Sequence, residues 1–185
     1  MVMQRREFLA GAGLGLLAFD VGGVITYLTP RAARANDVPL QILTPDEARC
    51  VEALGDTLLP GASEAGLAHY LDQQLAAPPA ESLLMIRYLD VPPPYAAFYK
   101  PCIAATIAAM RAKSDRPFDE LAAGDREGFV EDLQKGALTP WPAPPSPFFY
   151  FVLRADAVDV VYGTPEGFAK LGIPYMPHIM PPRNW

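Results

Sequence analysis

Proline is the residue that most limits how this chain can fold. The chain has 21 prolines in 185 residues, about twice the usual share of ~5%. They gather at positions 78–79, 92–94, 140–147 and 174–182. Because proline interrupts helix interiors and sheet ladders, these clusters divide the chain into short segments. Apolar residues recur at helical spacing within the segments. We therefore predict an all-α fold, a single compact domain of about five to six short helices with a proline-rich, irregular C-terminal tail.

The clearest helix start lies at Thr44. Thr44 suits the N-cap, Pro45 suits the first helical position, and Glu47 can complete a capping box. An apolar stripe follows, and Leu59-Pro60-Gly61 ends the helix. Residues 36–43 should form a short extended lead-in. Further helices are predicted at residues 64–76, 81–91, 95–113, 125–135 and 148–162.

The last predicted helix and the tail after it are the most apolar part of the chain. Apolar residues occupy nearly every side of residues 148–162, and such a helix is buried either by its own domain or by another chain. The tail, residues 163–185, adds further aromatic and methionine side chains, which interfaces favour. The alternative, that the tail folds back over its own helices, stays open. The predicted partner interface comprises Phe148, Phe149, Tyr162, Phe168, Tyr175, Met176, Met180 and Trp185.

Residues 1–35 have the three parts of an export signal. Arg5 and Arg6 form an adjacent basic pair, and Phe8 and Leu9 follow at once. A Gly/Ala-rich apolar run then extends over residues 10–28. The arrangement resembles a twin-arginine signal, an address that the twin-arginine translocon reads. That translocon carries folded proteins, so residues 36–185 should fold as one domain before export to the periplasm.

The small residues Ala33 and Ala35 mark the expected cleavage site. Cleavage after Ala35 is the simpler outcome. Retention of the leader as a membrane anchor stays open, although Asp20 lies in the middle of the apolar run and a central carboxylate costs about 2.5–3.5 kcal/mol on insertion scales.

Charge and cysteine content exclude several classes of protein. Removal of residues 1–35 changes the formal net charge from −6 to −8, which gives no electrostatic basis for binding nucleic acid. Cys50 and Cys102 are too few for an iron–sulfur cluster and do not form a haem-attachment motif. In an oxidising compartment a disulfide between them, a bridge to a partner and two buried thiols all stay open.

No catalytic, cofactor-binding or metal site is predicted in this chain. His69 has no second histidine, cysteine or clustered carboxylate three or four residues further along its helix, and His178 lies between a proline and an isoleucine. The glycines at positions 11, 13 and 15 imitate a nucleotide loop, but no strand precedes them.

Five short motifs connect the chain to a known family. They are Leu-Thr-Pro-Asp-Glu-Ala (43–48), Asp-Thr-Leu-Leu-Pro (56–60), Asp-Gln-Gln-Leu (72–75), Phe-Phe (148–149) and Tyr-Gly (162–163). In this order the chain resembles the gluconate 2-dehydrogenase subunit 3 family over most of residues 43–175. The family usually continues with Gly-Asn and a tryptophan, then Gly-Tyr-Pro. This chain instead has Thr164-Pro165, Phe168 near the tryptophan position, and Gly172-Ile173-Pro174.

The resemblance implies a small, all-helical accessory subunit of a periplasmic complex at the outer face of the cytoplasmic membrane. Its implied partners are a large FAD-dependent oxidoreductase subunit and a multihaem cytochrome c, so FAD and haem c are expected in those subunits and none in this one. The implied substrates are sugars, sugar acids or polyols.

A non-catalytic chain that carries a signal for folded cargo suggests a second task. It should escort a folded FAD-containing dehydrogenase through twin-arginine export and then stabilise it. The alternatives are a free-standing periplasmic helical binding module and a stand-alone enzyme. A neighbouring gene for a flavin oxidoreductase without a signal would favour the escort.

Overall fold

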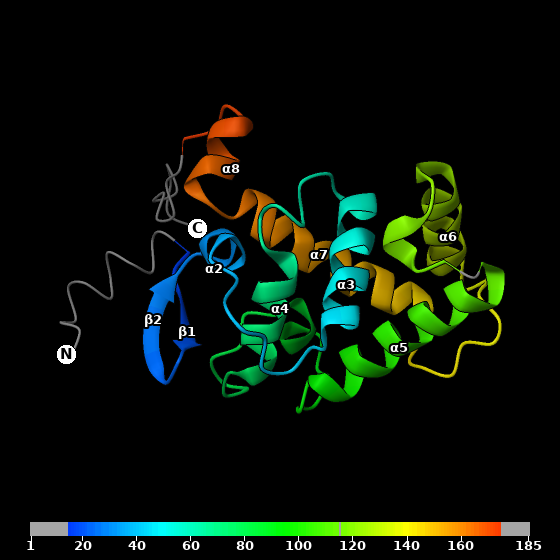
Figure 1. The fold of residues 1–185 in the computed structure, drawn as a ribbon, viewed down its shortest axis with the longest axis horizontal. Coiled ribbons are helices and arrows are strands. Elements are labelled where there is room, and N and C mark those ends of the chain that lie inside the picture. The colour runs from blue at the N-terminus through cyan, green and yellow to red at the C-terminus, as the bar shows by residue number, and fades with distance from the viewer. Residues whose placement is uncertain (1–14, 115, 175–185) are drawn as a thin grey trace, which may run out of the picture.

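The computed structural model describes residues 15–114 and 116–174, which form a helical body with a small hairpin at one end (Figure 1). The prediction of an all-α class is confirmed, with a two-stranded sheet added. The elements in order are β1 (Leu17–Val21), β2 (Val24–Leu28), α2 (Pro30–Ala35), α3 (Pro45–Leu58), α4 (Leu67–Ala76), the 3-10 turn η1 (Met85–Tyr88), α5 (Ala96–Lys113), the 3-10 turn η2 (Phe118–Glu120), α6 (Ala123–Lys135), α7 (Ser146–Tyr162) and α8 (Pro165–Lys170).

Helix α3 begins as its sequence predicts. The Thr44 side chain accepts a hydrogen bond from the Glu47 amide at 3.3 Å, and the Glu47 carboxylate accepts one from the Thr44 amide at 2.8 Å. This reciprocal pair is the capping box, with Pro45 in the first turn. Lys100 of α5 also contacts the Glu47 carboxylate at 2.5 Å. The helix start therefore also fixes α5 beside α3.

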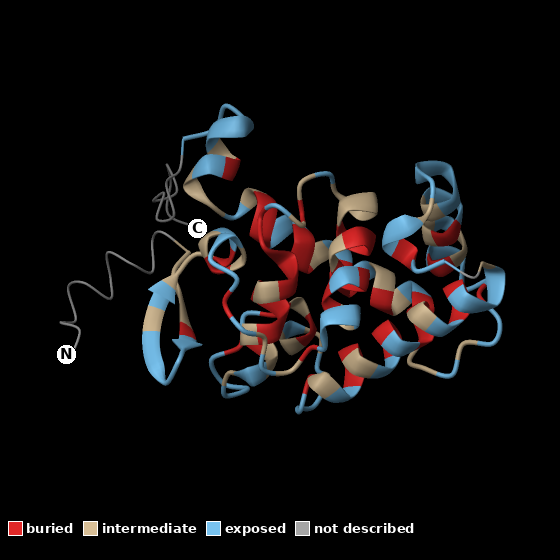
Figure 2. Cartoon of the chain, in the orientation of Figure 1, coloured by how far each residue is buried: buried red, intermediate tan, exposed pale blue. Residues whose placement is uncertain are grey.

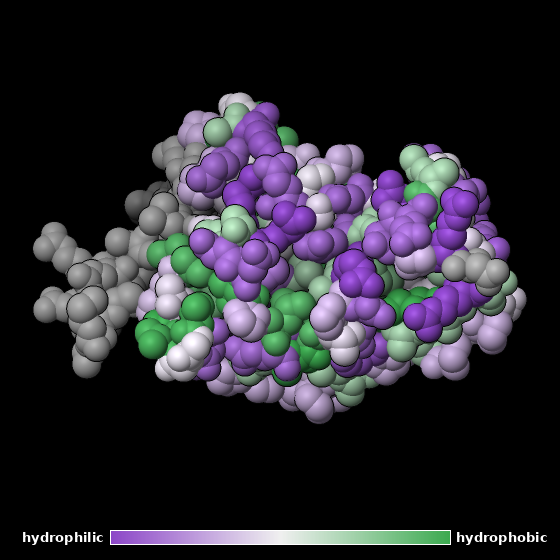
Figure 3. All heavy atoms as spheres, viewed as in Figure 1, coloured by the Kyte–Doolittle hydropathy of each residue, from purple (hydrophilic) through white to green (hydrophobic). Residues whose placement is uncertain are grey.

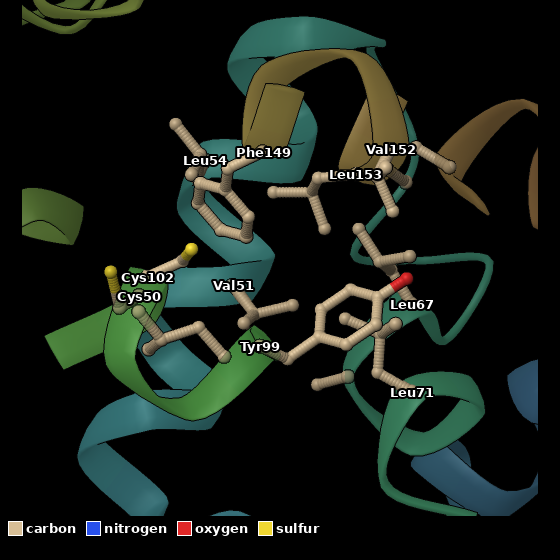
Figure 4. Close-up of a cluster of buried hydrophobic side chains, with 14 of the residues drawn as sticks. Cys50, Val51, Leu54, Leu67, Leu71, Tyr99, Cys102, Phe149, Val152 and Leu153 are labelled. Atoms are coloured by element: carbon tan, nitrogen blue, oxygen red, sulfur yellow. The ribbon is translucent and has the colours of Figure 1, made fainter. Parts of the chain in front are cut away.

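The core forms around α3, which contacts α4, α5, α6 and α7. Buried residues lie on the sides of these helices that face one another (Figure 2). Burying one such leucine or valine contributes about 1.5–3 kcal/mol. Figure 4 shows the central cluster of Cys50, Val51, Leu54, Leu67, Leu71, Tyr99, Cys102, Phe149, Val152 and Leu153, which comes from α3, α4, α5 and α7.

One buried carboxylate, Asp72 of α4, binds the lead-in before α3 to the helical body. Its two oxygens accept hydrogen bonds from the amides of Gln41, Ile42 and Leu43 at 2.7–2.8 Å. Asp72 is buried, and buried carboxylates are found where such partners satisfy them. The lead-in was predicted as extended, but it turns at residues 36–37 and bends at residues 41–43, where the Asp72 side chain binds three successive backbone amides.

The predicted helix at residues 81–91 is wrong, because only η1 forms there. Leu84 and Ile86 are both fully buried while their neighbours are not, so burial alternates along this stretch. The amides are satisfied by distant side chains instead of by a helix: Gln74 accepts from Leu83 at 2.5 Å and Asp156 from Met85 at 2.9 Å.

The structure also contains a hairpin within the predicted apolar run. Strands β1 and β2 pair antiparallel, with Val21 opposite Val24, so Gly22 and Gly23 form a two-residue turn. Both glycines have positive φ, 63° and 84°, as the tight turns favoured in hairpins require. The hairpin leads into α2, which Thr29 caps and Pro30 begins.

Candidate partner-binding surface

The outer face of α7 is the strongest candidate for a binding surface. Phe148, Phe151, Ala155, Val158 and Tyr162 follow one another at spacings of three or four residues, so they share one side of the helix. Phe151 is 49% exposed and Val158 is 37% exposed, and the other three are partly buried. We call these five residues the α7 outer face. Apolar side chains arranged in this way are typical of surfaces that another chain covers.

The cationic side chain of Arg154 lies beside the α7 outer face, three residues after Phe151 and four before Val158. Arg154 is exposed. No ion-pair partner for it is found among residues 15–114 and 116–174. A guanidinium beside apolar side chains is suited to bind a carboxylate from outside, since arginine and aromatic residues are enriched at interface centres.

The inner face of α7 fixes how the helix is oriented. Asp156 on that face is fully buried; its carboxylate accepts hydrogen bonds from the Met85 amide at 2.9 Å and from the Tyr99 hydroxyl. Burial raises the pKa of Asp156 to about 7, and these two hydrogen bonds only partly oppose the effect. Because Asp156 is held from both η1 and α5, rotation of α7 would break this network. Phe151 and Val158 therefore point away from the core, while Phe148 and Tyr162, at the two ends of the α7 outer face, pack partly against it.

The predicted interface residues have different positions in the structure. Phe149 is fully buried in the core, so its assignment to a partner surface is corrected: it lies on the inner face of α7. Phe148 is half-buried against Phe98, with 5.3 Å between ring centroids, and Tyr162 and Phe168 are also half-buried. The remaining four, Tyr175, Met176, Met180 and Trp185, lie outside the described residues.

A cleft of about 690 Å³ opens between residues 15–31 and the end of α7. Its walls include Leu17, Tyr70, Leu83, Tyr88 and Val160. Burial raises the pKa of the Tyr70 hydroxyl well above its usual range, with the carboxylates of α7 adding to the effect, so Tyr70 stays neutral. Five charged residues also line the cleft: Arg31, Glu64, Asp159, Glu166 and Lys170. A cleft of this size with a mixed apolar and charged lining can hold a small molecule or a peptide side chain.

Both cysteines are buried free thiols in the structure. Figure 4 shows them where α3 and α5 meet. Burial raises the pKa of each thiol to about 12, and for Cys50 the carboxylates of Asp119 and Glu47 add to the shift. Protonated, buried thiols are poor nucleophiles, so neither cysteine is a candidate catalytic residue.

The described residues contain no group of three or more histidine, cysteine, aspartate or glutamate side chains placed to hold a metal ion. His69 instead contacts the chain shortly after α2, where its Nε2 lies 3.1 Å from the Val38 carbonyl oxygen. In the same part of the chain, no helix is both long and apolar enough to span a bilayer.

The residues of the predicted export signal fall into two groups. Arg5, Arg6, Phe8 and Leu9 lie outside the described residues. Ala33 and Ala35, which precede the predicted cleavage site, lie within α2, and Ala33 is fully buried. The sequence pattern alone did not indicate this burial.

The fold and surface define a class: a small helical domain with a mainly apolar interior and an apolar outer helix face. Comparison with known families makes the assignment specific. The model of the gluconate 2-dehydrogenase subunit 3 family matches residues 45–181, which is most of the chain, and the chain belongs to that family. No curated protein and no solved structure matches the chain. The match begins at the first residue of α3, so the hairpin and α2 precede the family domain.

Proposed function

We propose that this chain is a non-catalytic accessory subunit of a membrane-associated, FAD-dependent dehydrogenase complex that oxidises sugars, sugar acids or polyols. Its family is a subunit family of a dehydrogenase complex, which supports an accessory place. The observation that carries the proposal is the α7 outer face, an apolar surface on a helix whose opposite side is already in the core. The large FAD-containing subunit is the partner proposed to cover it.

The proposed contact is an apolar centre with one charged pair. Full transfer of a large apolar side chain from water contributes about 1.5–3 kcal/mol. Phe151 and Val158 are 49% and 37% exposed, so each can add a part of that value as an anchor. A carboxylate of the large subunit would pair with Arg154. Haem c, when the complex contains it, would belong to a separate cytochrome subunit, and electrons would not pass through this chain.

The test of this surface is co-purification with the proposed FAD-dependent subunit when the two chains are produced together. The variant Phe151→Asp/Val158→Asp places charge on the α7 outer face and should weaken the complex at least tenfold, which corresponds to about 1.4 kcal/mol. Ala108→Asp is the matched control, because Ala108 is exposed on α5. Both variants should keep the helical circular dichroism of the native subunit. Equal recovery of the large subunit by both variants would contradict the proposal.

The second part of the proposal is escort through the twin-arginine translocon. The signal pattern at Arg5 and Arg6 supports it, because a flavin loaded in the cytoplasm requires a route for folded proteins. Replacement of both arginines by lysine should leave this subunit and the flavoprotein in the cytoplasm. Normal arrival of the flavoprotein in the periplasm would exclude escort while leaving the α7 contact untouched.

A free-standing binding module is the alternative function. The cleft of about 690 Å³ favours it, since a binding module needs a concave site. In that case the subunit would purify alone as a monomer, and Phe151→Asp/Val158→Asp would change no association.

A further inference from the structure

The N-terminal segment of the described chain, residues 17–38, is packed as part of the domain. Strand β1 and helix α2 both contact α4 (Figure 1). Phe19, Ala33 and Val38 are buried together as a small second core. Leu17 packs against both this core and the main one. Apolar contact therefore continues from the hairpin into the helical body.

The backbone of α2 makes a close approach that only glycine permits. Gly66, just before α4, has φ of +88°, and a Cβ there would overlap the backbone of Pro30 and Arg31. By contrast, Gly61 has φ of +91° with nothing within 4 Å of its Cβ position. The two glycines share a left-handed conformation, which favours glycine. Only Gly66 makes room for α2.

Polar contacts hold α2 on the side that faces the body. Arg34 pairs with Glu52 of α3 at 2.9 Å, and Arg31 pairs with Glu64 in the loop before α4. The carbonyl oxygen of Val38 also lies within hydrogen-bond distance of the His69 ring. The segment is thus attached through an apolar core, a backbone approach and two ion pairs. Its outward side carries Val24 and Ile25, 64% and 58% exposed, and Figure 3 shows apolar surface over the hairpin.

We propose that residues 17–35 stay in the mature subunit as a structural part of it, and that signal peptidase does not cut after Ala35. Proteases act on locally unfolded chain. Here Ala33 is 0% exposed and Ala35 is the last residue of a capped, docked helix. Removal of the segment would also uncover the side of α4 that β1 and α2 contact.

Retention of residues 17–35 depends on the proposed export in one respect only, because export determines the compartment from which the mature chain is collected. Its test is the intact mass and N-terminal sequence of the full chain, tagged at its C-terminus and recovered from the periplasmic and membrane fractions. A mature chain that includes residues 17–35 supports retention. A mature chain that begins at Asn36 overturns it, and this result leaves partner binding by α7 unaffected.

A pair of glycine variants tests the docking itself in the purified full chain. Gly66→Ala should displace α2, so trypsin should cut after Arg31 and Arg34 at least tenfold faster than in the native chain. Gly61→Ala introduces the same left-handed alanine without a clash and should leave these two rates near native. Hydrogen exchange at residues 30–35 should separate the variants in the same way, even if Gly66→Ala lowers overall stability. Equal cutting and exchange in the two variants would contradict the docking.

Discussion

Replacement of Asp156 by asparagine should remove a pH dependence of stability that this buried carboxyl imposes. Burial raises the pKa of Asp156 from its ordinary value of 3.8 to about 7. The folded state therefore holds the proton more tightly than the unfolded state. Because the folded state binds more protons between about pH 4 and pH 7, the free energy of unfolding falls as pH rises through that window.

The size of this effect follows from the shift. Each unit of pKa corresponds to about 1.36 kcal/mol, so the shift of roughly three units is worth about 4 kcal/mol in full. Between pH 5 and pH 8, Asp156 should lower the free energy of unfolding by about 2–3 kcal/mol. Asparagine can keep both hydrogen bonds, since its oxygen accepts from the Met85 amide and its amide group donates to the Tyr99 hydroxyl.

The assay is urea denaturation of the purified subunit and of Asp156→Asn at pH 5, 6, 7 and 8. The difference between their free energies of unfolding cancels the other titrating groups. It should change by about 2–3 kcal/mol in favour of the variant as pH rises from 5 to 8. Tyr99→Phe removes one donor from the carboxylate and should cost about 1–3 kcal/mol, more at pH 8 than at pH 5. Parallel pH profiles for the native chain and Asp156→Asn would contradict a raised pKa for Asp156.

Three further predictions concern stability. Thr44→Ala removes half of the capping box and should cost about 0.5–2 kcal/mol by thermal denaturation; no change would mean that Lys100 alone fixes the helix start. Asp72→Ala leaves three amides without their acceptor, so it should cost about 1–3 kcal/mol or more and speed hydrogen exchange at residues 41–43, whereas unchanged exchange would contradict the clamp. Leu54→Ala in the core should cost about 2–5 kcal/mol, while Val158→Ala on the α7 outer face should stay within about 0.5 kcal/mol; similar losses would place Val158 in the core.

Elements with local signals could be predicted from sequence. Thr44, Pro45 and Glu47 determine the start of α3 within one turn, and Gly136, with φ of 71°, ends α6. The stretch at residues 81–91 could not be predicted in this way, because its amides bind Gln74 and Asp156. Those partners come from other helices, and no local pattern contains them.

The hairpin was missed although its signal is local. Gly22-Gly23 between β-branched residues is a hairpin turn signature, but the same apolar stretch fits the middle of an export signal. Composition alone does not distinguish a β-hairpin from the apolar run of an export signal. The docking of α2 could not be predicted from local sequence. It depends on the close approach of the α2 backbone to Gly66, which is distant in the sequence.

The sequence placed the proposed binding surface on α7, and the structure corrects the side of the helix on which one of its residues, Phe149, lies. Phe149 and Phe151 are both aromatic, and a helix with apolar residues on all sides gives no sign of which side faces inward. In the structure, Asp156 decides it, since its partners Met85 and Tyr99 lie in the body. Phe151 and Val158 could have been identified from their spacing once Asp156 was known to be buried.

The Asp72 clamp has a mechanical consequence for a chain that is moved by its N-terminal end. Tension applied at the N-terminal end would first detach the hairpin and then α2 from the helical body, because their contacts would break one after another. It would then reach Gln41, Ile42 and Leu43, whose three amides share one carboxylate on α4 and would bear the load together. Force is thus delivered to the middle of the body, at α4, and the capped start of α3 is shielded from it.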